Sequence, residues 1–359
     1  MEPPQPNPPD TPIEAPIARK AVTLGDVGRH VGASLITVSR ALRKPEMVSE
    51  PLRAKILKAV NELGYVPNRV ASGLASGTAR LVPVVIPTLL HPVYIPFLEG
   101  TYSVLAQHGY QIILSTTEYH VSTEDQLIEA LLGWFPDGLF LSGVDHSART
   151  MRLLRRVHIP VVEVMDLSDS PIGINVGFSH HKVGVAVAEY FHRKGYRQIA
   201  YAGTMTEIDL RSGKRIAGFQ QTLKDYGLPY HYIQRSNEPF SIALGGKLLN
   251  ELLLQQPDIQ AVFFANDDLA AGALFECQRR GIRVPEQLAI MGFNDQEIAS
   301  STIPTITSVR TPRREMGQIA AQMLVDHLQG RPPAERQVDL GFKIIERAST
   351  QAAARSISD

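Results

Sequence analysis

The sequence of 359 residues has one cysteine, one tryptophan and no long apolar run. The lone Cys277 excludes an internal disulfide, cannot form a metal site by itself, and is expected to be a small apolar residue of a helix. No apolar stretch reaches the roughly 18 residues that a membrane span needs, and the first residues lack the basic and apolar segments of a secretory signal. These absences predict a cytoplasmic protein.

The chain also lacks the short motifs that mark several common enzyme classes. It contains no G-x-x-x-x-G-K-[ST], no G-x-S-x-G and no H-E-x-x-H. The adjacent His180 and His181 would point in different directions on a helix, which disfavours a metal site. We therefore expect no catalytic residues, no cofactor and no bound metal.

Net charge is zero over the whole chain, but the charges are segregated. Residues 18–80 contain eleven Lys and Arg against four acids and carry +7, whereas residues 1–17 have three acids and no base. The rest of the chain, 81–359, therefore carries −4. A basic segment on a weakly acidic body is typical of a phosphate-binding module joined to a sensing domain, although a solvated basic face would have the same composition.

Residues 23–42 show two short helical patterns separated by a glycine. Thr23 and Asp26 have the spacing of a capping box, Gly32 interrupts the chain, and Ser34 is placed to cap the second helix. This spacing is typical of a helix-turn-helix, in which the first helix braces the second across the major groove. An ordinary helical hairpin is the alternative.

A third helical pattern favours the helix-turn-helix over the simple hairpin. Apolar residues recur at helical spacing from Leu52 to Leu63, with Ser49 placed as a cap and Gly64 as a stop. Three short helices would enclose one small core. Within the first helix Gly28 costs roughly 0.5–1 kcal/mol relative to Ala, which predicts a head of less than average stability.

From residue 81 onward, short apolar runs alternate with helical patterns. Strand-like runs include LVPVVIP, QIILS, GLFLS, PVVEV, QIAYAG, AVFFAND and LAIMGF, and helices are expected near 122–132, 147–157, 212–226, 241–255, 268–280 and 313–329. Such alternation predicts parallel sheets covered by helices on both faces. About 270 residues exceed one comfortable doubly wound unit, so we expect an α/β domain of two lobes with a ligand cleft between them.

Several motifs, in this order, resemble the LacI/GalR family of sugar-responsive repressors. They are TLGDVGRHVGASLITVSRAL, VSEPLRAKILKAVNELGYVPN, FANDDLAAGAL and LAIMGFND, and the likeness runs from residue 23 to about 348. Within the family, PEMVSEPLRAKI and NDDLAAGALFECQRRGIRVPEQLAIMGF look closest to the gluconate-operon repressor branch.

The resemblance implies a DNA-binding head fused to a domain like a periplasmic sugar-binding protein, whose two lobes are joined by three crossovers. The expected parts are a proline-rich disordered leader at 1–20, the helix-turn-helix domain at 21–66, and a hinge helix with its linker at 67–80. An effector-binding and dimerisation domain would follow at 81–350. Lobe 1 would be about 81–177 and 310–337, and lobe 2 about 178–309 and 338–350. The family forms homodimers or tetramers, and two heads fit the two half-sites of palindromic double-stranded operator DNA.

The family pattern also implies the DNA contacts. The expected residues are Thr23, Leu35, Ile36, Thr37, Ser39, Arg40, Asn68, Ala71, Leu74 and Ala75. Leu35 and Ile36 occupy the two main base-reading positions and would cover a thymine methyl, although the spacing of Leu35 also fits a core residue. Arg40 would contact DNA, and Thr37 and Ser39 would bind phosphate. Leu74 would wedge into the minor groove, with a plain linker leucine as the alternative.

The expected effector-binding residues are Asp166, Arg215, Phe240, Asn266, Asn294 and Asp295. Arg215 belongs to the family's R-x-x-G-aromatic arrangement, and its guanidinium offers a bidentate fork to a carboxylate. Phe240 would stack on a sugar or belong to the core. Asn294 stands where the family commonly has aspartate, which leaves the ligand open.

These features predict a sequence-specific transcriptional repressor controlled by a small sugar acid, gluconate or a related aldonate, that lowers operator affinity. A regulator of the same family that responds to a neutral sugar or nucleoside is the first alternative. A sugar-binding or sugar-modifying protein is the second, and it would not need the basic head.

Overall fold

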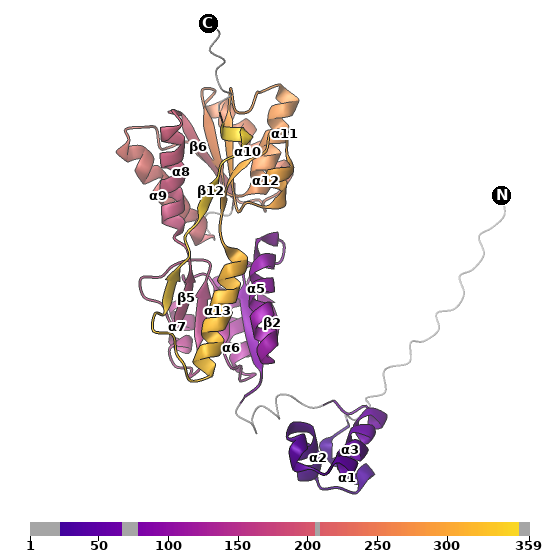
Figure 1. Cartoon of the computed structure of the whole chain (residues 1–359). Helices are drawn as coiled ribbons and strands as arrows, with labels where there is room; N and C mark the ends of the chain where they lie inside the picture. The colour runs from indigo at the N-terminus through magenta and orange to yellow at the C-terminus, as the bar shows by residue number, and fades with distance from the viewer. Residues whose placement is uncertain (1–21, 67–77, 205–208, 352–359) are drawn as a thin grey trace, which may run out of the picture. The chain divides into compact units, whose positions relative to one another are not determined.

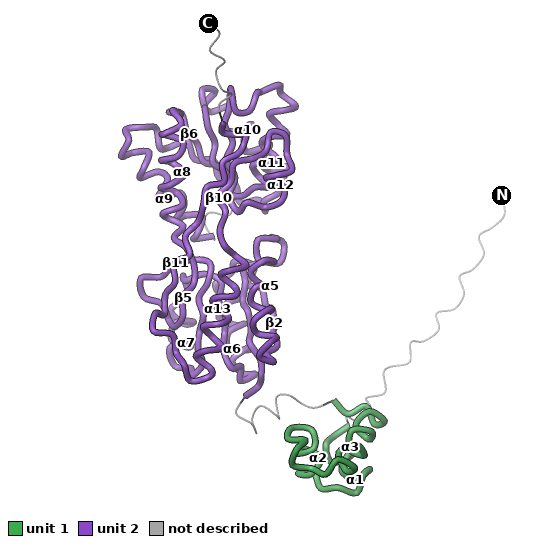
Figure 2. Tube along the Cα trace, viewed as in Figure 1, with its two compact units in different colours: residues 1–75 green, residues 76–359 purple. Residues whose placement is uncertain are grey.

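A computed structural model describes residues 22–66, 78–204 and 209–351, which form two units, each with its own core (Figures 1 and 2). Among the described residues, no helix has the length and apolar character needed to cross a membrane. The predicted leader and the hinge residues Asn68, Ala71, Leu74 and Ala75 lie outside the described residues.

The first unit is the predicted three-helix head. It consists of α1 (Leu24–Val31), α2 (Leu35–Arg43), a 3₁₀ turn (Pro45–Met47) and α3 (Glu50–Leu63). Thr23 and Asp26 form the capping box, with the amide of Thr23 donating to Asp26 Oδ2 at 2.8 Å. Gly32, at φ 73°, ends α1. The core that these helices enclose contains Val27, Val31, Val38, Ala41, Ile56, Ala59 and Tyr65.

Two local expectations for the head are modified by the structure. Ser49 occupies the N-cap position of α3, but its side chain makes no cap hydrogen bond. Gly28 is buried where α1 meets the turn, and a Cβ at this position would lie 2.7 Å from the carbonyl oxygen of Ala33. The missing side chain therefore permits close packing, which the propensity argument did not take into account.

The second unit contains two six-stranded sheets. The first has the order β11-β5-β4-β3-β1-β2 and is parallel throughout. Its strands are β1 (Leu81–Ile86), β2 (Gln111–Thr116), β3 (Leu139–Ser142), β4 (Val161–Val164), β5 (Ile174–Gly177) and β11 (Gln337–Asp339). The helices packed in pairs beside it are α5 (Ile95–Leu105) with α13 (Arg313–Leu328), and α6 (Val121–Leu132) with α7 (Ala148–Leu154). Together they form lobe 1.

The second sheet has the order β12-β10-β9-β8-β6-β7, and only β12 is antiparallel. Its strands are β6 (Ile199–Thr204), β7 (Ile233–Ser236), β8 (Ala261–Phe264), β9 (Ala289–Phe293), β10 (Thr307–Arg310) and β12 (Lys343–Ile345). The helices α8 (His180–Arg193) and α9 (Leu210–Asp225) pack together, as do α10 (Ile242–Gln255) and α11 (Asp267–Arg280); the short α12 (Glu297–Ser301) contacts α11. This is lobe 2.

The chain passes between the lobes three times (Figure 1). It crosses after β5 into α8, after β10 into α13, and between β11 and β12. The boundary expected at residue 337 falls within β11, which pairs with β5 in the first sheet before the chain returns to the second. These passages place the carboxyl ends of strands from both sheets around one region, where open α/β sheets bind ligands.

Candidate DNA-binding surface and ligand cavity

The first turn of α2 carries two adjacent exposed aliphatic side chains. Leu35 is 55% exposed and Ile36 is 61% exposed, while Val38 one turn later is fully buried. The alternative that Leu35 belongs to the core is therefore wrong. Exposed aliphatic groups at a helix N-terminus have the chemistry to contact thymine methyl groups, and the exposed Arg40 lies on the same helix.

Two of the hydroxyl groups expected to contact DNA, those of Thr23 and Thr37, already have partners within the head. The hydroxyl of Thr23 lies 2.7 Å from Asp26 Oδ2, and that of Thr37 lies 2.9 Å from the hydroxyl of Ser34. Ser34 also accepts a hydrogen bond from the amide of Thr37. The side chain of Ser39 is half-buried. These groups stabilise the helix ends whether or not they also contact a phosphate.

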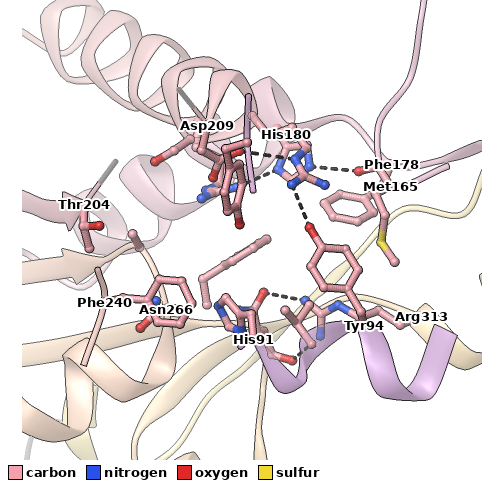
Figure 3. Close-up of a pocket in the computed structure, with 18 residues that line it drawn as sticks. His91, Tyr94, Met165, Phe178, His180, Thr204, Asp209, Phe240, Asn266 and Arg313 are labelled. Carbon is pink, nitrogen blue, oxygen red and sulfur yellow. Dashed lines mark hydrogen bonds and ion pairs between the residues drawn. The ribbon is translucent and has the colours of Figure 1, made fainter. Parts of the chain in front are cut away.

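A cavity lies between the lobes of the second unit, near the ends of strands β1, β2, β4, β5, β6, β7, β8, β9 and β10 (Figure 3). The space measures about 660 Å³, including the part open to solvent. Four of the six residues expected to bind an effector line it: Arg215, Phe240, Asn266 and Asn294. Its cationic lining consists of Arg211, Arg215 and Arg313, against one carboxylate, that of Asp209.

Arg215 is held by a buried histidine. Its Nη1 donates to His180 Nδ1 at 2.9 Å, and His180 Nε2 lies 2.9 Å from the carbonyl oxygen of Met165. Because a carbonyl oxygen only accepts, His180 carries its proton on Nε2 and accepts on Nδ1. Burial, followed by the charge of Arg215, lowers the pKa of His180 well below its usual value. The guanidinium also lies 4.3 Å from the centre of the Phe293 ring.

Close packing of α8 against α9 brings His180 and Arg215 together. A Cβ on Gly184 of α8 would lie 2.0 Å from the carbonyl oxygen of Arg215, so only glycine permits the observed approach. His180 begins α8 at the first crossover and reaches back to lobe 1 through Met165. The orientation of Arg215 thus depends on both lobes.

The other two arginines connect the lobes directly. From α9, Arg211 donates to the hydroxyl of Tyr94 at 2.9 Å and pairs with Asp209 at 3.3 Å. Arg313, at the start of α13, donates to the carbonyl oxygen of Asn294 at 3.0 Å and also to its side-chain oxygen. Both guanidinium groups therefore already have partners from the protein.

Three buried polar atoms of the cavity wall have no hydrogen-bond partner among the described residues. They are Arg215 Nε, Thr204 Oγ1 and His91 Nδ1. Arg215 is only 4% exposed, so its unpartnered N–H lacks both protein and bulk water. A ligand that accepts hydrogen bonds would satisfy this donor.

The second histidine of the wall is also neutral. Burial, followed by the charge of Arg313, lowers the pKa of His91 to about 3. Its ring lies 4.2 Å from that of Phe240, across the cavity from lobe 1 to lobe 2. Phe240 is therefore part of the cavity wall, while it also packs at the edge of the core.

The two asparagines also have structural roles. Asn266 is the N-cap of α11, and its Oδ1 accepts from the amide of Leu269 at 2.9 Å, which leaves its NH₂ group as the donor. Asn294 has φ 112°, a conformation that non-glycine residues rarely adopt. This conformation directs both its carbonyl and its side-chain oxygen to Arg313.

Asp166 and Asp295 do not line the cavity. Asp166 is buried and pairs with Lys214 of α9 at 2.6 Å, and the same Lys214 pairs with Asp145 at 2.7 Å. Asp295 pairs with Arg310 and Arg347 at 2.5 and 2.7 Å. Both acids support the walls of the cavity from outside it.

Sequence reasoning missed most of the cationic and histidine lining. One signal was available, because Arg211 and Arg215 lie four residues apart and share a helix face. His180 was considered only as a metal ligand. His91, Tyr94 and Arg313 gave no signal, since His91 and Tyr94 lie in and after an irregular loop beyond β1, and Arg313 reaches the cavity only after the chain has crossed back to lobe 1.

Comparison with known proteins identifies both parts of the chain. Residues 23–68 match the family of bacterial regulatory proteins of the lacI type, and residues 188–350 match a periplasmic binding protein-like domain. The transcriptional regulator GntR of Pseudomonas aeruginosa is 40% identical over 330 residues, which cover 91% of this chain and 95% of the relative. GntR of Escherichia coli K12 is 38% identical over 327 residues, which cover 91% of this chain and 98% of the relative.

Solved structures agree with the sequence relatives. A LacI family regulator from Silicibacter pomeroyi has a TM-score of 0.87 and 33% identity, covering 92% of this chain and all of that one. The transcription regulator GntR from Chromobacterium violaceum has a TM-score of 0.72 and 37% identity, covering 75% of this chain and 99% of that one. The chain therefore belongs to the LacI family of bacterial regulatory proteins and is a DNA-binding transcriptional repressor.

Proposed function

We propose that the effector is a sugar acid, gluconate or a related aldonate, and that its binding lowers operator affinity. The observation that carries this proposal is the charge of the cavity, with three guanidinium groups against one carboxylate. One of these groups, that of Arg215, is buried and has an Nε–H without a partner among the described residues. A ligand carboxylate at Arg215 Nε would neutralise the charge of the guanidinium and accept a hydrogen bond from the Nε–H at the same time.

The hydroxyl groups of an aldonate fit the rest of the wall. Thr204, His91 and the NH₂ group of Asn266 supply hydrogen-bonding atoms, and the Phe240 ring offers an apolar face. We propose that Arg215, Phe240, Asn266 and Asn294 contact the effector, whereas Asp166 and Asp295 act through the cavity walls.

A neutral sugar or nucleoside is the alternative effector. It would leave the buried guanidinium of Arg215 without a counter-charge, which costs free energy in a site this enclosed. The cavity therefore favours an anionic ligand over a neutral one.

The proposed mechanism is a shift between lobe arrangements. The contact of Arg211 with Tyr94 joins the two lobes across the cavity in the arrangement described here, and a ligand that binds both walls would favour this arrangement. Through the hinge residues Asn68, Ala71, Leu74 and Ala75 this change would loosen the DNA-bound state in a cytoplasmic repressor. A Leu74→Ala variant that binds operator as tightly as wild type would contradict the minor-groove wedge.

We propose a homodimer as the DNA-binding form, with a tetramer as the alternative. Several large apolar side chains are exposed on α5, on the loop before it and on the edge strand β2, namely Leu89, Leu90, Ile95, Tyr102 and Leu114. These residues offer apolar area for a second copy, and a two-fold dimer matches a palindromic operator.

Binding of the purified protein to an operator selected from random duplexes tests the effector. Gluconate is expected to weaken operator binding, whereas gluconamide, which replaces the carboxylate by a neutral amide of similar size, should have no effect at the same concentration. Arg215→Gln should abolish the response while leaving operator affinity in the absence of ligand unchanged. An equal response to gluconate and gluconamide would show that the carboxylate is not what the site recognises.

A further inference from the structure

One end of lobe 1 is basic, although residues 81–359 carry a net charge of −4. Helix α7 ends there in a run that contains Arg152, Arg155, Arg156 and His158. All four side chains are exposed. Among the described residues, none of these three arginines has a hydrogen-bond or ion-pair partner for its side chain.

Side chains from two other segments join this cluster. Arg155 and His158 border a hollow together with His327, which is near the end of α13, and Arg336, which precedes β11. No acidic residue borders the hollow. Among the acids near these residues in the chain or sheet, Asp326 is paired with Arg331 at 2.8 Å, Asp137 accepts from the amide of Leu81 at 3.0 Å, and the exposed Glu335 is adjacent to Arg336. We refer to Arg152, Arg155, Arg156, His158, His327 and Arg336 as the basic edge.

Interaction with the helix end explains only part of this cluster. Basic residues near a helix C-terminus complement its partial negative charge, a role that one or two of the α7 arginines would fill. Arg336 and His158 lie outside helices. Unpaired positive charges that lie close together also repel one another, and an anionic partner would reduce this repulsion.

The basic edge lies at the end of the sheet where the chain enters the second unit. Val161 begins β4, Leu139 begins β3 beside it, and β3 pairs with β1, which begins at Leu81. Adjacent parallel strands are about 4.8 Å apart, which places the start of β1 roughly 10–15 Å from the start of β4. Residues 67–77 connect this edge to the DNA-binding head.

We propose that the basic edge binds backbone phosphates of duplex DNA that flanks the operator. The DNA-binding head is covalently joined to the chain segment that precedes β1, and exposed arginines supply charge-assisted hydrogen bonds to phosphate without reading bases. Lobe 1 would thus extend the contacted DNA beyond the half-sites and raise affinity for operators within long DNA.

The test compares two duplexes that carry the same selected operator, one ending at the half-sites and one with about 15 extra base pairs on each side. The triple variant Arg152→Ala, Arg155→Ala, Arg156→Ala removes three charges from the basic edge. The matched control, Arg193→Ala, Arg235→Ala, Arg283→Ala, removes three exposed arginines from lobe 2, none of which has a side-chain partner among the described residues. Because both variants are measured on the same duplex, end effects of short DNA cancel.

The expected result is confined to the long duplex. There the slope of log K against log of salt concentration should be shallower by roughly 5 in the basic-edge variant than in the control, since a dimer loses six phosphate contacts and each contributes about 0.9. On the short duplex both variants should bind as tightly as wild type. Binding to this duplex measures the head alone, and so it reports separately whether operator recognition works.

Two outcomes would overturn the proposal. Equal slopes for the two variants on the long duplex would show that the basic edge does not contact DNA and is free for another acidic partner. A basic-edge variant that weakens binding to both duplexes equally would show an effect on the head rather than on flanking DNA. Thermal unfolding followed by circular dichroism checks that both variants fold.

Discussion

Gly28 illustrates how packing reverses a propensity argument at a single residue. Replacing a helical glycine with alanine normally stabilises a helix by roughly 0.5–1 kcal/mol. Here the new Cβ would lie 2.7 Å from the carbonyl oxygen of Ala33, a backbone atom that cannot move alone. We predict that Gly28→Ala lowers the free energy of unfolding of the head by roughly 1–3 kcal/mol, measured by thermal denaturation of the full chain.

Gly25 provides the matched control in the same helix. A Cβ there would meet only the hydroxyl of Thr23 at 3.6 Å, an ordinary contact. Gly25→Ala should therefore leave the head as stable as wild type or slightly more so. If the two substitutions had the same effect, the close approach of Gly28 to the turn would not be a constraint.

Asp267, at the start of α11, predicts a pH dependence of stability. Burial raises its pKa to about 7, from an ordinary value near 4. Between these values the folded protein holds a proton that the unfolded chain has released, so this group makes the protein less stable as pH rises. We predict that unfolding in urea shows a loss of stability from pH 5 to 8 that is smaller in Asp267→Asn. Parallel pH profiles for the two proteins would contradict this assignment.

At the scale of an element, Lys214 attaches α9 to lobe 1. It pairs with Asp145 and Asp166, which both belong to the other lobe, and it does not line the cavity. We predict that Lys214→Ala weakens effector affinity by several-fold, because the lobe arrangement that encloses the ligand loses a contact. Calorimetric titration with gluconate would measure this change.

Lys247→Ala controls for the loss of an ion-paired lysine. Lys247 pairs with Glu238 within lobe 2, so its removal should leave the affinity unchanged. If both variants lost affinity equally, net charge rather than the contact between lobes would be responsible.

The sequence predicted most of the elements with strong patterns, but it missed the 14-residue helix α8 as well as two weak strands. Fully buried strands such as β8 and long helices such as α13 were expected, because continuous apolar runs and helical spacing identify them. The exposed edge strand β7, which contains Arg235, and the four-residue β5 lack either pattern. Their places depend on pairing with neighbouring strands, which local sequence does not encode.

Only those residues of the candidate site that belong to a sequence motif could be predicted. Arg215, Asn266 and Asn294 follow from strand ends and from the resemblance to the family. His180 and Arg313 did not, because each lies directly after a crossover and faces the cavity through the path of the chain rather than through a local pattern.

For the whole molecule, the separate cores of the two units predict two unfolding transitions. The core of the head, around Val38 and Ile56, shares no residue with that of the second unit. Since a ligand stabilises only the state that binds it, gluconate should raise the melting temperature of the larger transition, and operator DNA should raise that of the smaller one. Differential scanning calorimetry of the full chain would show this. A single transition that both ligands shift together would contradict independent folding of the units.

The three passages of the chain between the lobes limit how the lobes can move. Two lobes connected by one segment can rotate about any axis, and each additional connection restricts that rotation. Because the segment between β11 and β12 forms the third connection, we expect the lobes to open and close mainly about the axis that the three crossovers define. One pair of distance probes, placed on the far rims of the two lobes, would then report how far the effector cavity opens.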